Sequence, residues 1–156
     1  MLVGVLSDSH DNLPKLGAAV EVLRAMGAEH LVHAGDFVAP FAVKVLAGCG
    51  IPFTGVFGNN DGEKAGIRSV SRSVHEAPHA FELGGRRIVV VHDLGKLPDE
   101  ARDGAEIVIF GHTHKILVEP GPPLLLNPGE VGGWLGGRST VALLDLDSLE
   151  VSILDV

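Results

Sequence analysis

The chain has 156 residues, a length typical of one compact domain, so we expect residues 1–156 to form a single domain. It carries 12 Lys and Arg against 20 Asp and Glu, and its formal net charge of -8 argues against a general nucleic-acid or anionic-membrane coat. A single cysteine, Cys49, excludes an internal disulfide and a Cys-rich zinc site, and no apolar run is long enough to span a membrane. We therefore expect a cytoplasmic protein that binds no membrane and forms no stable nucleic-acid complex.

The first 60 residues alternate short apolar runs with helical patterns. Apolar runs at 2–6, 30–33 and 53–57 predict strands, and helices are predicted between them at 12–27 and 40–47. Strands that are joined by helices run parallel, with right-handed crossovers. This region therefore predicts a βαβαβ unit.

The second half of the chain has a different pattern. Residues 62–78 predict a loop with one short helix, and a β-hairpin with a Gly84-Gly85 turn is predicted over 80–91. A brief helix is predicted at 98–103. Further strands are predicted at 106–110 and, as an antiparallel group, at 115–118, 124–126, 140–146 and 149–154. The predicted fold class is α/β (α+β), with two mixed sheets packed face to face and helices outside.

Five polar clusters each follow a predicted strand. They are Asp8-Ser9-His10, Gly35-Asp36, Gly58-Asn59, His92 and Gly111-His112-Thr113-His114. Loops at the carboxyl ends of strands bind ligands in such sheets, so we expect these clusters to converge on one crevice. Two pairs of these residues have i, i+2 spacing, Asp8 with His10 and His112 with His114. On an extended backbone this spacing would place both side chains of a pair on one face.

The clusters contain seven side chains of metal-binding types, with no thiolate among them: Asp8, His10, Asp36, Asn59, His92, His112 and His114. Carboxylate, imidazole and amide donors favour manganese, iron, zinc or nickel over copper or an iron–sulfur cluster. Four ligands are enough for one structural zinc, whereas seven can complete two sites if one carboxylate bridges. Two metals about 3.5–4 Å apart can hold both the attacking and the leaving oxygen in phosphoryl transfer.

In this order, the motifs Asp-x-His, Gly-Asp, Gly-Asn, His and Gly-His-x-His resemble those of the calcineurin-like metallophosphoesterase superfamily. The chain is similar in length to the superfamily's small bacterial and archaeal phosphodiesterases of the YfcE type, and Asn127-Pro128-Gly129 resembles their Asn-Pro-Gly-Ser turn. The resemblance implies a four-layer αββα fold and hydrolysis of small phosphodiesters with two divalent metal ions. Manganese is the first expectation, with nickel, zinc or iron as alternatives. A homodimer formed by strand-edge pairing is left open.

The resemblance also implies roles for individual residues. Asp8, His10, Asp36 and His114 would hold the first metal, and Asp36, Asn59, His92 and His112 the second, with Asp36 bridging. In the family, a hydroxide shared by the two metals attacks phosphorus. Asp36, Asn59 and His92 would take part in catalysis, with the amide of Asn59 offering an N–H to the phosphoryl group.

The sequence departs from the superfamily pattern at three positions. Asn60 stands where many members carry a histidine that assists the leaving group, so no general acid is evident. Asp93 stands where a glycine is usual, and Glu130 where a serine is usual. Both carboxylates are expected near the substrate, and Glu130 is expected to disfavour phosphomonoester dianions relative to diester monoanions.

Two alternative functions remain open, a phosphomonoesterase and a non-catalytic protein–protein scaffold. The small retromer subunit resembles this fold and works as a scaffold, but its metal pocket is degraded, whereas all seven ligand types are present here. Other metallohydrolases with His-x-His, such as amidohydrolases, place that motif early in the chain or within a longer His-rich motif. Here Asp-x-His comes first and His-x-His last, which favours the phosphoesterase.

Three further residues have open roles. His33 lies on the strand before Asp36 and is a candidate for supporting a metal ligand. Asp61 either orients a ligand by a hydrogen bond or caps the segment that follows. Trp134 is a substrate-side lid, an oligomer contact or a packing residue.

Overall fold

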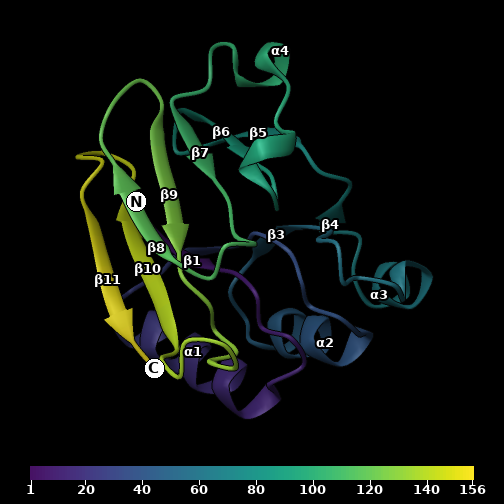
Figure 1. Ribbon diagram of the computed structural model, residues 1–156. Coiled ribbons are helices and arrows are strands. Elements are labelled where there is room, and N and C mark those ends of the chain that lie inside the picture. The colour runs from purple at the N-terminus through teal and green to yellow at the C-terminus, as the bar shows by residue number, and fades with distance from the viewer.

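A computed structural model describes residues 1–156 and contains two β-sheets with helices on their outer faces (Figure 1). The first sheet has the order β11 (Val151–Asp155), β10 (Thr140–Asp145), β1 (Leu2–Leu6), β2 (His30–His33), β3 (Phe53–Val56) and β4 (Val74–His75). The second has the order β5 (His79–Leu83), β6 (Arg86–Val90), β7 (Ile107–Ile109), β9 (Leu124–Pro128) and β8 (Ile116–Glu119). The helices are α1 (Leu13–Ala25), α2 (Pro40–Gly48), α3 (Lys64–Val70), the 3-10 turn η1 (Leu94–Lys96) and α4 (Asp99–Arg102).

The predicted βαβαβ unit forms the centre of the first sheet. Strands β1, β2 and β3 are parallel neighbours, and α1 and α2 are the crossovers between them. Helix α1 begins after Asn12, whose side chain accepts a hydrogen bond from the N–H of Lys15 at 3.4 Å. The buried side chains of Leu16 and Leu23 then pack the helix against the sheet in one hydrophobic cluster with Leu31.

The two sheets share a core because their strands bury both faces. In β1, Val3 and Val5 belong to the cluster between the sheets, whereas Leu6 packs on the helix side. In β6, Ile88 faces the same inner cluster, and Val89 faces a third cluster on the outer side of the second sheet. Alternate residues of a strand point to opposite faces, so the parts that are buried on both faces, residues 3–6 of β1 and 88–90 of β6, have no polar side chain.

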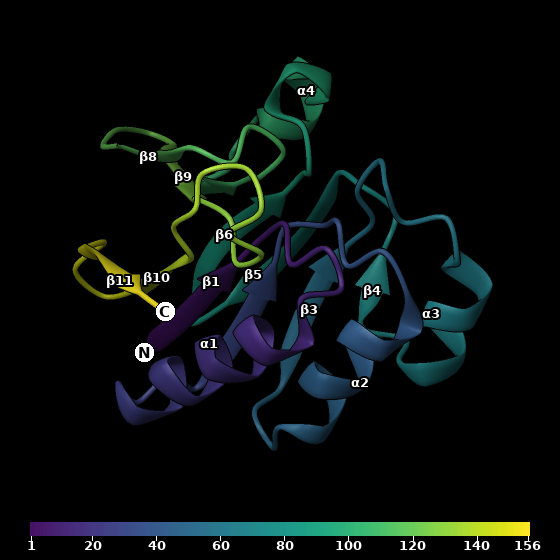
Figure 2. The same cartoon turned by 60° about the horizontal axis from the view of Figure 1, so that its bottom comes forward.

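Four layers result from this packing, as the resemblance implied. Figure 2 shows α1 and α2 on one side of the two sheets and α4 on the opposite side. The outer layer on the second sheet is thin, since α4 has four residues and η1 three. No helix of the chain combines the length and the apolar character needed to cross a membrane.

The structure differs from the expected elements in two regions. The segment predicted as a loop with one short helix contains α3 and also the two-residue strand β4, which pairs with β3 at the sheet edge. The expected antiparallel group of later strands is divided between the two sheets, and β9 pairs in parallel with β7. Pairing partners that are distant in sequence decide the sheet to which each strand belongs, and local periodicity does not encode them.

Candidate metal centre

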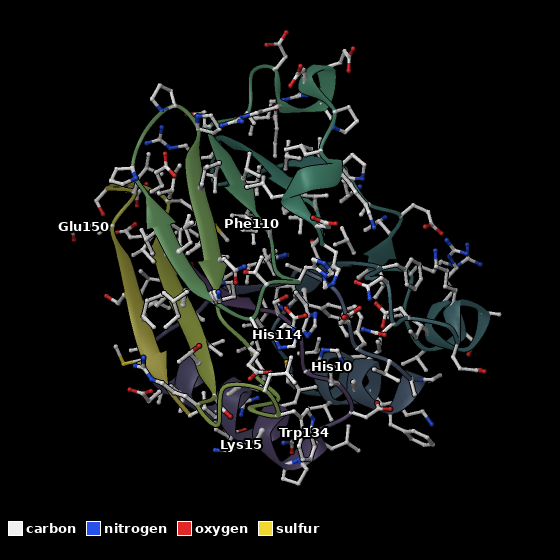
Figure 3. The ribbon with its side chains drawn as sticks, viewed as in Figure 1. His10, Lys15, Phe110, His114, Trp134 and Glu150 are labelled. Carbon is white, nitrogen blue, oxygen red and sulfur yellow. The ribbon has the colours of Figure 1, made fainter.

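Loops from five strands meet at the carboxyl ends of the two sheets. Figure 3 shows His10, which follows β1, close to His114, which follows β7, and the two rings stack with centroids 5.2 Å apart. His10 Nε2 lies 3.6 Å from both Asp8 Oδ1 and Asp36 Oδ2. His92 Nε2 lies 3.3 Å from Asp36 Oδ2, and His114 Nε2 lies 3.3 Å from Asp8 Oδ1. Five of the seven expected ligands therefore lie within one cluster.

Two groups in this cluster have the spacing of metal ligands. Asp8, His10 and His114 form one group and Asp8, Asp36 and His92 the other, with the ligand atoms of each group all within 4.8 Å of one another. Asp8 is common to both groups, whereas the resemblance implied Asp36 as the shared carboxylate. Asp36 nevertheless lies 3.6 Å from His10 of the first group, so both carboxylates lie between the two sets of imidazoles.

Asn59 and His112 lie outside the buried cluster. The side chain of His112 is 42% exposed, and its Nε2 is 3.9 Å from Asp93 Oδ2. Its ring meets that of His92 edge-on, with centroids 5.1 Å apart. Asn59 is exposed and lines a pocket of about 190 Å³ together with His92, Asp93 and Lys96. These two expected ligands therefore lie on the solvent side of His92.

The backbone of the site is not extended, so the expected i, i+2 geometry is wrong. Five of the expected ligands have positive φ angles: Asp8 (53°), His10 (43°), Asp36 (61°), His112 (66°) and His114 (58°). This left-handed conformation is uncommon for residues other than glycine and persists only where the surroundings impose it. Backbone hydrogen bonds from the first loop to the second, Asp8 N to Gly35 O and His10 N to Asp36 O, both 3.0 Å, stabilise it here.

Ser7 and Asn60 orient the two buried carboxylates. Asp8 Oδ2 accepts hydrogen bonds from Ser7 Oγ at 2.6 Å and from the N–H of His112 at 3.0 Å, which leaves Oδ1 for the cluster. Asp36 accepts from the backbone N–H of Asn60 at 2.8 Å and from its side-chain amide at 2.7 Å. Sequence patterns predict neither role, and the only signal for them is that Ser7 is adjacent to Asp8 and Asn60 to Asn59.

Glycine is required at two positions because the loops approach each other closely. A Cβ on Gly35 would lie 2.8 Å from His92 Nδ1 and 2.9 Å from Gly58 N. A Cβ on Gly111 would lie 2.6 Å from Asp8 Oδ2 and would also collide with Ser7. The glycines of the Gly-Asp and Gly-His motifs thus allow backbone to pack directly against the metal-binding side chains.

The charges of the cluster stabilise one another. Burial raises the pKa of Asp8, but the imidazole of His10 and the hydroxyl of Ser7 outweigh it, and the pKa lies below its usual value. Burial likewise opposes ionisation of Asp36, and interactions with His92 and Asn60 bring its pKa well below the usual range. The pKa of His10 is raised by Asp8. Burial lowers the pKa of His92, but Asp36 more than reverses this effect, and the net shift is upward.

Three buried polar atoms in the cluster have no hydrogen-bond partner: Asp8 Oδ1, His10 Nε2 and His92 Nε2. An unpaired buried polar group costs about 1–3 kcal/mol, so three at one point need a common explanation. Carboxylate oxygen and imidazole nitrogen are ligand atoms for divalent transition metals. The donor set and its orphaned atoms therefore fit a bound cation.

Asp61 and His33 support the loops that carry Asp36. Asp61 is buried and accepts hydrogen bonds from the backbone N–H groups of Asp36 (3.0 Å), Val38 (2.7 Å) and Gly58 (2.7 Å), so it supports a ligand loop and does not cap α3. Burial raises its pKa. His33 accepts from the N–H of Gly35, and burial lowers its pKa to about 3, so the ring is neutral near pH 7.

Glu130 and Asp93 have different surroundings. Glu130 is 1% exposed, and its Oε2 lies 2.6 Å from His114 Nδ1, so the expected position facing the substrate is wrong. Asp93 accepts from the N–H of Gly95 at 3.0 Å and so caps η1. It also lines the pocket beside Asn59 and His92, and therefore remains close to the expected substrate.

The loop after Glu130 closes one side of the centre. Trp134 is 65% exposed and donates its Nε1–H to the carbonyl oxygen of His10 at 3.3 Å, which excludes a role as a core packing residue. Together with Leu135, His10, His114 and Asn60 it lines a pocket of about 280 Å³. Figure 3 shows its side chain near His10.

A sequence model of the calcineurin-like phosphoesterase superfamily domain matches residues 1–149. The chain belongs to this superfamily, which confirms the resemblance of its ordered motifs, and its enzyme class is therefore phosphoesterase.

A curated relative, Phosphodiesterase MJ0936 of Methanocaldococcus jannaschii, is 30% identical over 159 residues, which cover 96% of each chain. A solved structure described as a novel archaeal phosphodiesterase covers all of both chains, with 28% identity and a TM-score of 0.90. The phosphoesterase Yfce from E. coli has 20% identity and a TM-score of 0.76, with 99% of this chain and 98% of that chain covered.

The same fold also occurs in Vps29. The Entamoeba histolytica protein, solved in complex with Zn²⁺, has 21% identity and a TM-score of 0.72, and the match covers 99% of this chain and 91% of that chain. At this identity the similarity concerns the fold alone.

Proposed function

We propose that this chain is a metal-dependent phosphoesterase that hydrolyses small phosphodiesters. The observation that carries the proposal is the set of orphaned buried atoms, Asp8 Oδ1, His10 Nε2 and His92 Nε2, at the carboxyl ends of the strands. The similarity to phosphodiesterases of nearly the same length supports the substrate class.

In this proposal two divalent cations bind at adjacent positions, with manganese preferred and nickel, zinc or iron as alternatives. Asp8, His10, Asp36 and His114 hold one cation, and Asp36, Asn59, His92 and His112 hold the other. The support is strongest for the five members that lie together in the cluster, of which Asp8, Asp36 and His92 are buried and His10 and His114 half-buried. Asn59 and the ring of His112 would have to direct their ligand atoms into the cluster, and their exposure leaves them free to do so.

Bound cations would supply positive charge to a phosphoryl group and lower the pKa of a water molecule enough for attack on phosphorus near neutral pH. The chain's own residues have simpler tasks. Asp36 holds its carboxylate between His10 and His92, and His92 is oriented by an Nδ1 hydrogen bond to the carbonyl oxygen of Ala34 at 2.8 Å. The exposed amide of Asn59 would donate an N–H to a phosphoryl oxygen.

Metal binding alone does not distinguish the proposed phosphoesterase from the scaffold alternative. A Vps29 of this fold was solved with Zn²⁺, so a bound ion is compatible with both readings. Turnover separates them, because a scaffold does not need to cleave an ester. The ratio of diester to monoester hydrolysis then separates the proposed phosphodiesterase from a phosphomonoesterase.

The experiment starts with protein stripped by a chelator and reconstituted separately with Mn²⁺, Ni²⁺, Zn²⁺ or Fe²⁺. We expect hydrolysis of bis(p-nitrophenyl) phosphate to disappear on stripping and to return with Mn²⁺. We also expect the diester to be cleaved faster than p-nitrophenyl phosphate. Metal binding without cleavage of either ester would favour the scaffold, and faster cleavage of the monoester would favour the phosphomonoesterase.

The proposal also includes a cytoplasmic location and no stable complex with nucleic acid, in keeping with a formal net charge of -8. A homodimer formed through strand edges remains part of it. The edge strand β8 exposes Ile116, Leu117 and Val118 and is the edge at which we expect such pairing.

A further inference from the structure

We propose that Glu130 is a positioning residue for His114. Its carboxylate keeps the imidazole hydrogen on Nδ1, which leaves the lone pair of Nε2 directed at the side of Asp8 where the proposed cation binds. The inference rests on the proposed function, because a free Nε2 on His114 matters only if this residue binds a metal. The hydrogen bond between Glu130 and His114 is present in the metal-free chain.

Both oxygens of Glu130 are engaged by protein groups. Oε1 accepts hydrogen bonds from the backbone N–H groups of Leu135 at 3.1 Å and Gly136 at 2.7 Å. Oε2 lies 2.6 Å from His114 Nδ1. A backbone N–H can only donate, so Oε1 accepts twice, and an ionised carboxylate can only accept, from which we infer that Nδ1 donates its hydrogen to Oε2.

The other ring nitrogen of His114 faces the candidate centre. Its Nε2 lies 3.3 Å from Asp8 Oδ1, the carboxylate oxygen that has no hydrogen-bond partner. A neutral imidazole has one hydrogen, so a hydrogen on Nδ1 leaves Nε2 as the ligand atom. The hydrogen bond to Glu130 thus sets both the rotation and the tautomer of the ring from outside the cluster.

The position of Glu130 suits this role. Its side chain is buried, and its backbone carbonyl accepts a hydrogen bond from the N–H of Thr140 at 2.9 Å. Serine, the residue expected here from the resemblance, has a single short hydroxyl that cannot reach the loop amides and the imidazole together. Glutamate spans the distance between the loop and His114, so it also ties the loop that carries Trp134 to a proposed ligand.

The variant Glu130→Gln isolates the effect, because glutamine has the same shape but one acceptor end and one donor end. We expect the amide oxygen to keep the two backbone hydrogen bonds of the loop, since two bonds outweigh one. The NH₂ group then faces Nδ1, which must accept, and the hydrogen of His114 moves to Nε2. Glu100→Gln makes the same chemical change on the exposed helix α4 and is the matched control.

The first readout is the tautomer of His114 in metal-free protein, obtained from long-range ¹H–¹⁵N NMR of the imidazoles at about pH 8.5, where most histidines are neutral. The second is the Kd of Mn²⁺ from calorimetry. We expect Nδ1–H in the wild type and in Glu100→Gln. In Glu130→Gln we expect Nε2–H and binding of Mn²⁺ weakened by about 10–100-fold.

Three results would overturn the inference: an Nε2–H tautomer in the wild type, a wild-type ring that carries hydrogens on both nitrogens at this pH, or Glu130→Gln with an unchanged tautomer and an unchanged Kd. The wild-type spectrum needs no variant, so a folding defect in Glu130→Gln does not remove the test. A wild type with the Nδ1–H tautomer that binds no Mn²⁺ would support the role of Glu130 and contradict the proposed function.

Discussion

The buried carboxylates Asp8 and Asp36 and the exposed side chains of Asn59 and His112 are expected to serve the same metals, but they are held very differently. Asp8 and Asp36 are nearly inaccessible to solvent and accept hydrogen bonds from Ser7, His112 and Asn60. No side-chain hydrogen bond holds Asn59 or the ring of His112. In the proposed function, the buried carboxylates therefore form the preorganised part of the site, and the exposed side chains can move when a substrate binds.

The largest effect is expected at the buried centre, in Asp36→Ala. Removing a group that merely supports a ligand costs about 10–100-fold, so the loss of a carboxylate between two imidazoles should cost more than about 100-fold in diester hydrolysis. Metal content after gel filtration and the initial rate on bis(p-nitrophenyl) phosphate measure the effect. Asp103→Ala, which removes an exposed carboxylate, should behave as wild type. Retention of a full complement of metal by Asp36→Ala would contradict the shared role of this residue.

His112 and His114 allow the exposed side of the site and its buried centre to be tested by the same substitution. His112 and His114 have similar positive φ angles, 66° and 58°, so an alanine meets similar backbone strain at either position. We expect His114→Ala to weaken Mn²⁺ binding by about 10–100-fold and His112→Ala by less than about tenfold. Calorimetric titration of both variants measures this difference. The reverse ranking would mean that the exposed ring anchors the metal.

The last effect is expected in the pH dependence of stability, because the buried His33 supports the loop that carries Asp36. Its folded-state pKa is lowered from 6.5 to about 3 by burial, so the unfolded chain binds the extra proton between these values. The stability that His33 contributes is fully present above pH 6.5 and is lost as the pH falls toward 3. The slope from one such group is at most about 1.4 kcal/mol per pH unit.

Urea denaturation of the wild type and His33→Gln between pH 7 and pH 4 tests this expectation, and the variant should lose stability less steeply on acidification. His10 and His92 contribute with the opposite sign, because their raised pKa values add stability that is lost as the pH rises. The difference between the two proteins therefore isolates His33. Parallel curves would show that the buried ring is not the source of the slope.

Much of the fold follows from local patterns, and the exceptions have physical causes. The strand 30–33 and the helix 40–48 agree with the prediction within a residue, because apolar runs and proline and glycine mark their ends. Strand β4 was missed since two residues with only Val74 buried leave no periodicity. The assignment of β8 and β9 to one sheet and β10 and β11 to the other depends on distant pairing.

The amino-acid sequence alone is enough to recognise the family and the set of candidate ligands, because five short motifs in a fixed order follow apolar strands. How these side chains are arranged depends on the tertiary fold. Left-handed turns, and not extended strands, bring Asp8 and His10 together. Burial separates the centre from Asn59 and His112, and Glu130 lies behind His114 instead of facing the substrate. Hydrogen-bond partners and exposure depend on which loops meet in space, and residue spacing along the chain does not specify this.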